Sequence, residues 1–407
     1  MTRFLAYAPQ SGSSIGTELG RSDYSYWFVL KYFEPLLASI GDVVILDSPD
    51  APAPGGPGPD DVRLLFLPPH RIGPDLARGA IPVFAWEYDT IPSEPWGGEP
   101  ANDWRVTLAA ARGAITHSRY AADAVHRTMG QDYPVTSLPA PLWDRFAPLA
   151  QEPTPRVWQW HVSARVLDSW QAGLREGPVL DEAVPLPEPR EQSLTFEGIV
   201  YTTVANPDDG RKRWQDTLTA FVTAHRDHPD ATLIIKIVHF DALVGFGIVW
   251  HVLRRLGPFA CRVVVVQGYL TDDAMETLIT GSDFVVNSSR GEGQCLPLME
   301  FMSAGVPAIA PAHTAMAEYV TAASGFPVGW TEEWTQWPHD ARLVLRCLTY
   351  PPRWDQLVEA FQASYRIARE DPDAYLELSR GAQRAQHDYC SREVVGASLR
   401  RFLAELR

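Results

Sequence analysis

Asp283-Phe-Val-Val-Asn-Ser-Ser-Arg-Gly-Glu-Gly-Gln-Cys-Leu-Pro-Leu-Met-Glu-Phe-Met-Ser-Ala-Gly-Val-Pro307 combines an apolar run, a glycine turn and a helical pattern. The run Phe284–Asn287 is apolar except at its end, which is typical of a strand covered on both faces of a parallel sheet. The helical pattern begins near Pro297, a residue favoured in the first turn of a helix. This order predicts a strand, a glycine turn and a helix of an α/β domain.

The same alternation of short apolar runs and helical patterns extends along the chain in both directions. Ten further runs predict buried strands: Phe4–Ala8, Val43–Leu46, Leu64–Leu67, Val83–Trp86, Ala114–His117, Val135–Leu138, Ile199–Val204, Leu233–Val238, Val263–Gln267 and Ala308–Ala310. Strands alternating with helices indicate parallel sheets with right-handed crossovers. We therefore predict an α/β fold with two facing Rossmann-like domains.

A proline-rich segment separates the two halves. Residues 151–195 contain six prolines and little periodicity, so we predict an irregular linker there. The predicted N-terminal domain spans 1–190 and the C-terminal domain spans 196–387. Residues 388–407 carry apolar side chains at helical spacing, which predicts an amphipathic helix that returns to the N-terminal domain.

Composition narrows the possible partners and the compartment. The 407 residues include 35 Lys and Arg against 50 Asp and Glu, a net charge of −15, which argues against nucleic-acid binding. The longest apolar stretch, Leu243–Leu253, is shorter than the ~18 residues that a membrane span needs. The start of the chain does not resemble a secretory leader. Four distant cysteines predict reduced thiols, so we expect a cytoplasmic protein without a structural metal.

The glycine turn predicts an anion site. Gly291 and Gly293 allow the backbone to approach a ligand, and the following helix N-terminus favours a phosphate or diphosphate. Glu292 and Glu300 flank this site, and carboxylates beside a diphosphate are better suited to bind hydroxyl groups. The alternative interpretation is an ordinary turn between strand and helix, with glutamates on its surface.

A second candidate element follows the predicted strand Ile199–Val204. Arg211, Lys212 and Arg213 cluster at the start of a helix, where cations oppose the helix dipole. A bound anion would explain their position, and a solvated basic turn is the alternative. The neighbouring Asp208-Asp209 pair is interpreted as turn residues and not as a metal motif.

Glu292-Gly-Gln-Cys-Leu-Pro-Leu-Met-Glu300, followed by Ala304-Gly-Val-Pro-Ala-Ile-Ala-Pro311, resembles the E-x7-E signature of retaining glycosyltransferases of the family-4 type with a GT-B fold. The resemblance covers roughly residues 197–330. It implies a nucleotide diphosphate sugar as donor, bound mainly by the second domain. It also implies transfer to a hydroxyl acceptor with retention of configuration, and no requirement for a metal or other cofactor.

The resemblance also implies roles for individual residues. Lys212 and Arg211 would stabilise the leaving diphosphate, Glu292 would hold the donor sugar and Glu300 the ribose. Further expected donor contacts are Gly293, Gln294, Cys295, Leu296, Arg213 and Gly268. Independently of the resemblance, the turn that ends at Gly16 follows the first predicted strand, and its two interpretations are a close backbone approach to the donor phosphates or the acceptor, and a flexible turn. The sequence departs from the family where Asn206 replaces an arginine and where Gln294-Cys295 replaces an aromatic-glycine pair.

The acceptor side is expected in the first half of the chain. Glu87 and Asp89 follow a predicted strand, and His117 ends another, so all three are candidates for acceptor contact. Hydrogen-bonded loop acids, and a helix cap formed by His117-Ser118, are the alternatives. The acceptor would be a saccharide, a natural product or a protein. A catalytically silent GT-B protein that binds a nucleotide or a partner enzyme is the second functional hypothesis.

Overall fold

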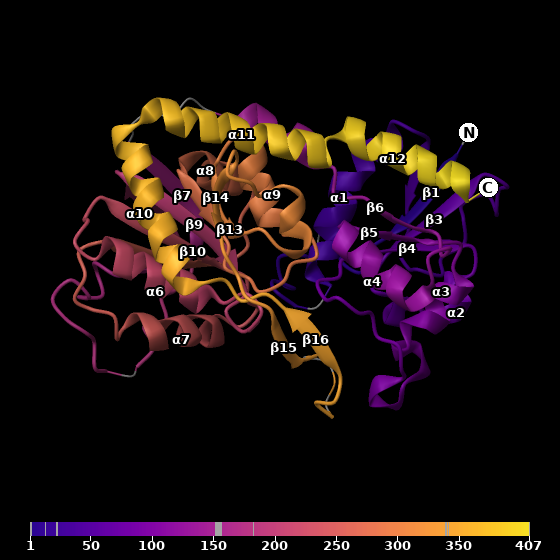
Figure 1. Ribbon diagram of the computed structural model, residues 1–407, viewed down its shortest axis with the longest axis horizontal. Coiled ribbons are helices and arrows are strands. Elements are labelled where there is room, and N and C mark those ends of the chain that lie inside the picture. Colours follow the sequence, from indigo (N-terminus) through magenta and orange to yellow (C-terminus); the bar gives the residue numbers. More distant parts are fainter. Residues whose placement is uncertain are drawn as a thin grey trace.

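Two α/β domains lie side by side in the computed structural model (Figure 1), which describes residues 2–406 except 13, 22, 151–156, 182, 338, 339 and 341. One sheet has six strands in the order β2-β1-β3-β4-β5-β6, and the other has eight in the order β14-β13-β12-β9-β10-β11-β7-β8. The predicted α/β fold with parallel sheets is confirmed, because every pairing among β1–β6 and β9–β14 is parallel.

The N-terminal domain is the six-stranded sheet with helices on both faces. Its strands are β1 (Arg3–Tyr7), β2 (Asp42–Ile45), β3 (Asp61–Phe66), β4 (Ala80–Phe84), β5 (Ala114–Thr116) and β6 (Val135–Ser137). Its helices are α1 (Tyr24–Ala38), α2 (Pro69–Ala77), α3 (Trp104–Ala110), α4 (Arg119–Met129) and α5 (Trp143–Phe146). The side chain of Ser118 caps α4 by accepting a hydrogen bond from Ala121 N at 3.2 Å, as the sequence predicts.

The C-terminal domain is built on the eight-stranded sheet. Its parallel strands are β9 (Ile199–Ala205), β10 (Ala231–Ile237), β11 (Arg262–Gln267), β12 (Phe284–Val286), β13 (Ala308–Pro311) and β14 (Gly325–Val328). The intervening helices are α6 (Trp214–His225), α7 (Ala242–Leu253), α8 (Asp272–Gly281) and α9 (Leu296–Ser303). Each of the eleven apolar runs predicted as strands overlaps a strand of the structure.

The predicted linker contains two strands and belongs to the C-terminal sheet, which corrects the boundary at residue 190. β7 (Trp158–Asp168) pairs antiparallel with β11 and with β8 (Arg190–Phe196). The prolines fall in the connection 169–189, while inward and outward positions alternate along most of β7. Residues 151–156, also part of the predicted linker, lie outside the described residues.

A hairpin extends from the C-terminal domain and contacts the N-terminal domain. It consists of β15 (Glu333–Gln336) and β16 (Arg346–Thr349) and projects away from both sheets (Figure 1). The ring of Trp337 packs against Trp86 and Trp96 with centroids 6.1 and 5.1 Å apart. No pattern in the sequence predicts this hairpin.

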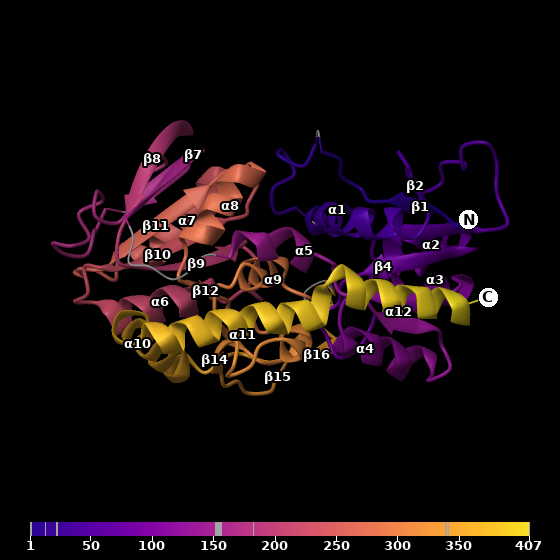
Figure 2. The same ribbon diagram turned by 90° about the horizontal axis from the view of Figure 1, so that it is seen from above.

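Three helices complete the chain: α10 (Trp354–Glu370), α11 (Pro372–Cys390) and α12 (Arg392–Glu405). In Figures 1 and 2, α11 and α12 run in sequence across both domains, and α12 lies over the N-terminal domain. Leu399 and Phe402 are buried there in one core with Leu36 of α1. Asp144 accepts a hydrogen bond from Arg392 N at 2.8 Å, near the start of α12.

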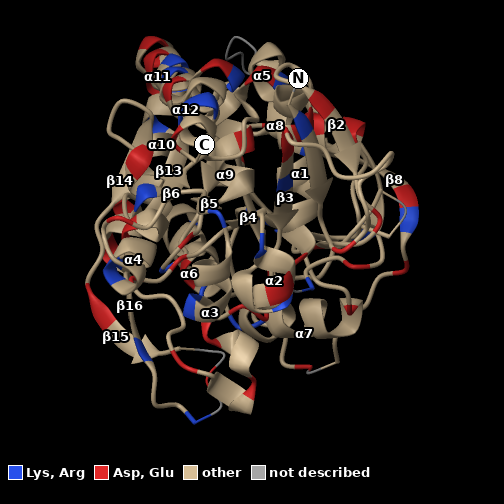
Figure 3. Cartoon of the chain, turned by 90° about the vertical axis from the view of Figure 1, so that its right-hand side faces the viewer, with Lys and Arg blue, Asp and Glu red and all other residues tan. Residues whose placement is uncertain are grey.

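Short 3-10 helices lie at Trp96–Gly98, Pro100–Asn102, Ala147–Leu149 and Thr314–Glu318. Among the described residues, none of the helices is both long and apolar enough to span a bilayer. Acidic and basic residues are interspersed over the elements seen in Figure 3. All four cysteines are buried free thiols.

Candidate active site between the domains

A cavity of about 910 Å³ lies between the two domains and is lined by both. The C-terminal domain contributes residues from the segments after β9, β11 and β12, where the carboxyl ends of parallel strands meet at one edge. The N-terminal domain contributes α1 and the segment after β4. Ligands of open α/β sheets bind at such an edge, so this cavity is the candidate active site.

Glu292 is the centre of a polar network on the wall of the cavity. Its Oε1 is 2.7 Å from Lys212 Nζ and accepts a hydrogen bond from Ser289 Oγ at 2.6 Å. Its Oε2 is 3.1 Å from Arg211 Nη1. Asn287 Nδ2 donates a further, longer bond of 3.3 Å to Oε1. The side chain is only 4% exposed, so both cations are held against a carboxylate that has little access to water.

These contacts set the charge of Glu292. Burial opposes ionisation of the carboxyl group, but Lys212 and Arg211 outweigh burial and lower its pKa to about 2. The carboxylate is therefore charged throughout the neutral range. It can accept hydrogen bonds from hydroxyl groups, and it has no proton to donate.

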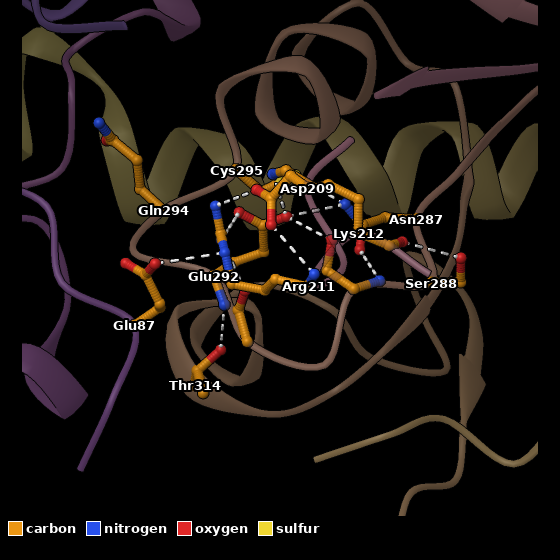
Figure 4. A network of polar contacts seen from close by, with 12 residues as sticks. Glu87, Asp209, Arg211, Lys212, Asn287, Ser288, Glu292, Gln294, Cys295 and Thr314 are labelled. Atoms are coloured by element: carbon orange, nitrogen blue, oxygen red, sulfur yellow. Dashed lines mark hydrogen bonds and ion pairs between the residues drawn. The ribbon is translucent and has the colours of Figure 1, made fainter. Parts of the chain in front are cut away.

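Arg211 connects three acids and both domains. Its guanidinium group lies 3.1 Å from Asp209 Oδ2, 3.1 Å from Glu292 Oε2 and 3.2 Å from Glu87 Oε1. Figure 4 shows Glu87 reaching Arg211 from the N-terminal domain, with Glu292 on the other side of the guanidinium. Burial raises the pKa of Glu87, and Arg211 partly offsets this. Three acids from both domains therefore face the guanidinium group of Arg211.

The glycine turn after β12 lets the two domains approach closely. A Cβ atom on Gly293 would lie 2.9 Å from Ala85 Cβ and 3.0 Å from Trp86 N. Cys295 adopts a left-handed conformation (φ 64°) immediately before α9, and its buried Sγ lies 3.1 Å from Asn287 Nδ2. The segment Gly293–Leu296 thus lines the cavity at the N-terminus of α9, where free backbone N–H groups favour an anion.

Glu300 lies one turn into α9 and faces the other domain. Its Oε1 accepts a hydrogen bond of 2.7 Å from Tyr32 Oη of α1. Burial raises the pKa of Glu300 above its ordinary value, and the hydrogen bond from the Tyr32 hydroxyl offsets only part of this rise. A carboxylate fixed in this way is suited to accept hydrogen bonds from a pair of hydroxyl groups.

Residues 212–335, which include Lys212, Glu292 and Glu300, match the family model described as Glycosyl transferases group 1. This segment is a glycosyltransferase domain. No curated protein sequence gives a significant match to the chain.

Two solved structures resemble the whole chain. HepE from Anabaena, determined with UDP and glucose, is 14% identical, with a TM-score of 0.57 and 100% of both chains covered. Sucrose-phosphate synthase from Thermosynechococcus elongatus is 13% identical, with a TM-score of 0.56, and covers 100% of this chain and 99% of its own. At this identity the likeness shows the fold, which is GT-B.

The structure brings most of the predicted site residues of the glycosyltransferase domain into the cavity, together with Glu87. Arg211, Lys212, Glu292, Gln294, Cys295, Leu296, Gly293 and Glu300 all line it. The Gln294 side chain points away from the Glu292 network (Figure 4) and accepts a hydrogen bond of 3.1 Å from Ala140 N. Gln294 therefore joins the domains at the edge of the cavity.

Five predicted site residues do not line this cavity. Arg213 pairs with Asp216 at 2.6 Å, and Asp89 Oδ1 accepts from Leu348 N at 2.9 Å in the hairpin. His117 is buried with Nδ1 2.8 Å from Leu138 O, and burial lowers its pKa to about 4. Gly16 and Gly268 lie just behind the lining: Gly16 packs near Tyr269, and the Gly268 carbonyl accepts a bond from Lys236.

Tyr32 and Lys236 are among the cavity residues that the sequence did not identify as candidates. Tyr32 lies within an amphipathic helix, where nothing distinguishes it from a core tyrosine. The sequence does distinguish Lys236, because it is the one charged residue in the buried strand β10. A lysine in an otherwise apolar strand is rarely placed there without a polar environment.

Proposed function

We propose that the chain transfers a sugar from a nucleoside diphosphate sugar to a hydroxyl acceptor, with retention of configuration and without a metal ion. The observation that carries this proposal is the pair of cations Arg211 and Lys212, gathered around Glu292 beside the N-terminus of α9. This arrangement offers positive charge and backbone N–H groups to a diphosphate. The spacing of Glu292 and Glu300 supports the E-x7-E type of donor site.

In the proposed reaction, the bond between the anomeric carbon and the diphosphate breaks while the acceptor oxygen attacks from the same face. Negative charge grows on the leaving diphosphate, and Arg211, Lys212 and the α9 N-terminus stabilise it. The acceptor proton passes to an oxygen of the leaving diphosphate. No covalent glycosyl-enzyme is part of this proposal.

Donor binding requires an exchange of partners at the cationic wall. Lys212 and Arg211 are paired with Glu292, and a diphosphate would compete for both cations. Glu292 would then accept hydrogen bonds from donor sugar hydroxyls, and Glu300 would accept them from the ribose. Two cations and a helix N-terminus can supply the countercharge that a metal supplies elsewhere.

The acceptor would enter from the N-terminal side, where Glu87 and Trp86 line the cavity. A saccharide, a natural product or a protein hydroxyl all remain candidates of the proposal. The neighbouring HepE structure contains UDP and glucose, which makes UDP and UDP-glucose the first ligands to test.

Thermal-shift measurements with UDP, GDP, ADP, CDP and dTDP in EDTA test the donor site. A nucleotide at ~100 times its Kd should add ~2.7 kcal/mol to the stability of the folded state. Lys212→Ala should abolish the shift, and Arg213→Ala, the neighbouring cation paired with Asp216 outside the cavity, should retain it. Donor turnover in EDTA then tests catalysis, and product stereochemistry by NMR tests retention. Absence of a shift with all five nucleotides would overturn the proposal.

One observation favours a catalytically silent, nucleotide-binding protein as the second candidate. Asn206 stands where the family carries an arginine, and its side chain donates to Gly20 O at 3.1 Å and accepts from Asp208 N at 3.1 Å. It adds no charge to the cationic wall. Nucleotide binding that survives Glu292→Ala, with no donor turnover in either protein, would support this second function.

A further inference from the structure

Lys236 lies at the carboxyl end of β10 and lines the cavity, although it is only 4% exposed. Its Nζ donates hydrogen bonds to Ile237 O at 3.0 Å and to Gly268 O at 2.7 Å. An ammonium group has three N–H donors. Two of them are used by these carbonyl oxygens, and within the described residues the third has no partner, so it is available to a ligand in the cavity.

Lys236 differs from the other cations that line the cavity. Lys31 and Arg145 pair with Asp272 at 3.0 and 2.8 Å, and Arg71 lies 3.5 Å from Asp23. Arg21, Arg211 and Lys212 also have acidic partners. Within the described part of the chain, the polar contacts of Lys236 are with backbone carbonyls, and burial lowers its pKa to about 7. A buried cation without a carboxylate partner is costly unless a ligand completes its contacts.

The position of Lys236 in the sheet indicates which part of the proposed donor it would contact. In the sheet, Lys236 is in register with Val204 of β9 and with Val266 of β11. Arg211 and Lys212, the proposed diphosphate ligands, follow β9, on one side of β10. The segment Gly268–Leu270 follows β11, on the other side, and Tyr269 and Leu270 line the cavity. A ligand that extends from the diphosphate site across the strand ends toward β11 places its nucleoside over Lys236.

We propose that Lys236 reads the nucleobase of the donor and selects a base with a carbonyl oxygen on the edge remote from the ribose. Uracil and thymine (O4) and guanine (O6) present such an acceptor, whereas cytosine and adenine present an amino group there. At pH 6, below its pKa of about 7, Lys236 is an ammonium group with donors only, so an amino group opposite it leaves both partners unpaired. This inference rests on the proposed function, because it assigns the base of the same nucleotide donor.

The strength of the preference follows from one hydrogen bond to a charged donor. We expect UDP to bind about 10- to 100-fold more tightly than CDP, which corresponds to about 1.4–2.8 kcal/mol. GDP, if its larger ring is accommodated, should exceed ADP in the same way. The diphosphate contacts are common to all four nucleotides and cancel in these ratios.

Isothermal titration of the full chain with UDP and CDP in EDTA tests the assignment. Lys236→Met keeps the length of the side chain and removes its donors, so UDP should lose about 10- to 100-fold in affinity while CDP changes little. Tighter UDP than CDP binding in the wild type, with the ratio collapsing in Lys236→Met, supports the proposal. Equal losses for UDP and CDP would place Lys236 on the phosphates and would overturn it.

A ligand-side deletion keeps the proposal falsifiable if Lys236→Met does not fold. The diphosphate of a 2-pyrimidinone riboside lacks O4 and should bind the wild type about as weakly as UDP binds Lys236→Met. Binding as tight as that of UDP would overturn the base assignment and leave the transferase proposal intact. Failure of the wild type to bind any of these nucleotides would instead overturn the transferase proposal, and the base assignment with it.

Discussion

The Glu87 carboxylate lies 3.2 Å from Nε of Arg211, and this ion pair joins the segment after β4 in one domain to the segment after β9 in the other. Arg211 is also the residue proposed to hold the donor diphosphate. The same guanidinium therefore joins the two domains and is proposed to bind the diphosphate. A negatively charged donor must compete with a carboxylate of the opposite domain.

Glu87→Gln removes this competitor and should tighten UDP binding by up to about tenfold, which corresponds to about 1.4 kcal/mol. Titration calorimetry at fixed ionic strength measures the change. Glu94→Gln is the matched control. Glu94 also pairs with an arginine of the other domain, Arg342 at 3.0 Å, but this ion pair is more exposed. Weaker UDP binding in Glu87→Gln would show that Glu87 supports the donor site.

The lowered pKa of Glu292 should make the stability of the folded state depend on pH. Its pKa of about 2 in the folded state is below the ordinary value of 4.5, so the unfolded chain binds the proton more readily. The stabilisation is fully present above about pH 5 and is lost as the pH falls toward 2. Its size is on the order of 3 kcal/mol.

Urea unfolding of wild type and Glu292→Gln between pH 6 and pH 3 checks this prediction. The free-energy difference between the two proteins should shrink as the pH falls. Glu333→Gln, on the exposed strand β15, should follow the wild type throughout. A difference that stays constant over this range would mean that Glu292 does not carry the linkage.

The Tyr32 hydroxyl positions Glu300 across the domain boundary. Tyr32→Phe removes a hydrogen bond to a carboxylate, worth about 1.5–3 kcal/mol, and should lower UDP affinity by about tenfold or more. The preference for UDP over 2′-deoxy-UDP should fall in parallel, because Glu300 is the proposed ribose ligand. Tyr133→Phe removes a hydroxyl bonded to Leu108 O away from the cavity and should change neither value. An unchanged ribose preference in Tyr32→Phe would contradict this assignment.

Gly293 is where the domains touch most closely at the glycine turn. Gly293→Ala places a methyl group 2.9 Å from Ala85 Cβ and should hold the domains apart. We expect a larger radius of gyration in solution scattering and about 100-fold slower transfer, since a misplacement of about 1 Å costs that much. Gly210→Ala, with open space around its Cβ, is the control. Full transfer activity in Gly293→Ala would exclude close apposition at this point.

Much of the fold was predictable because the parallel strands are buried on both faces. β4, for example, is buried at all five positions, and such runs stand out in the sequence. The hairpin β15–β16 could not be found in this way, because three of the four positions of β15 are exposed. β7 was missed because prolines on both sides of it suggested a linker, although its own residues alternate in burial.

For the candidate site, too, the residues marked by a local pattern could be predicted and the contacts between domains could not. Arg211, Lys212 and Glu292 follow strands at positions that local spacing reveals. Contacts such as Glu87 with Arg211 depend on how two domains meet, and no local pattern encodes that distance. His117 was a candidate for acceptor contact, but its ring lies against the Leu138 carbonyl oxygen. A histidine at a strand end can be buried in this way as readily as it can be exposed to a ligand, and the sequence does not distinguish the two cases.

The path of α12 also constrains how the protein is made. Domains generally fold in the order in which they leave the ribosome. The N-terminal domain, however, shares its core with Leu399 and Phe402, which are translated after the entire C-terminal domain. Its α1 surface beside Leu36 therefore stays uncovered during most of synthesis. The first domain to emerge is the last to mature, and the growing chain exposes apolar surface on which a chaperone can act.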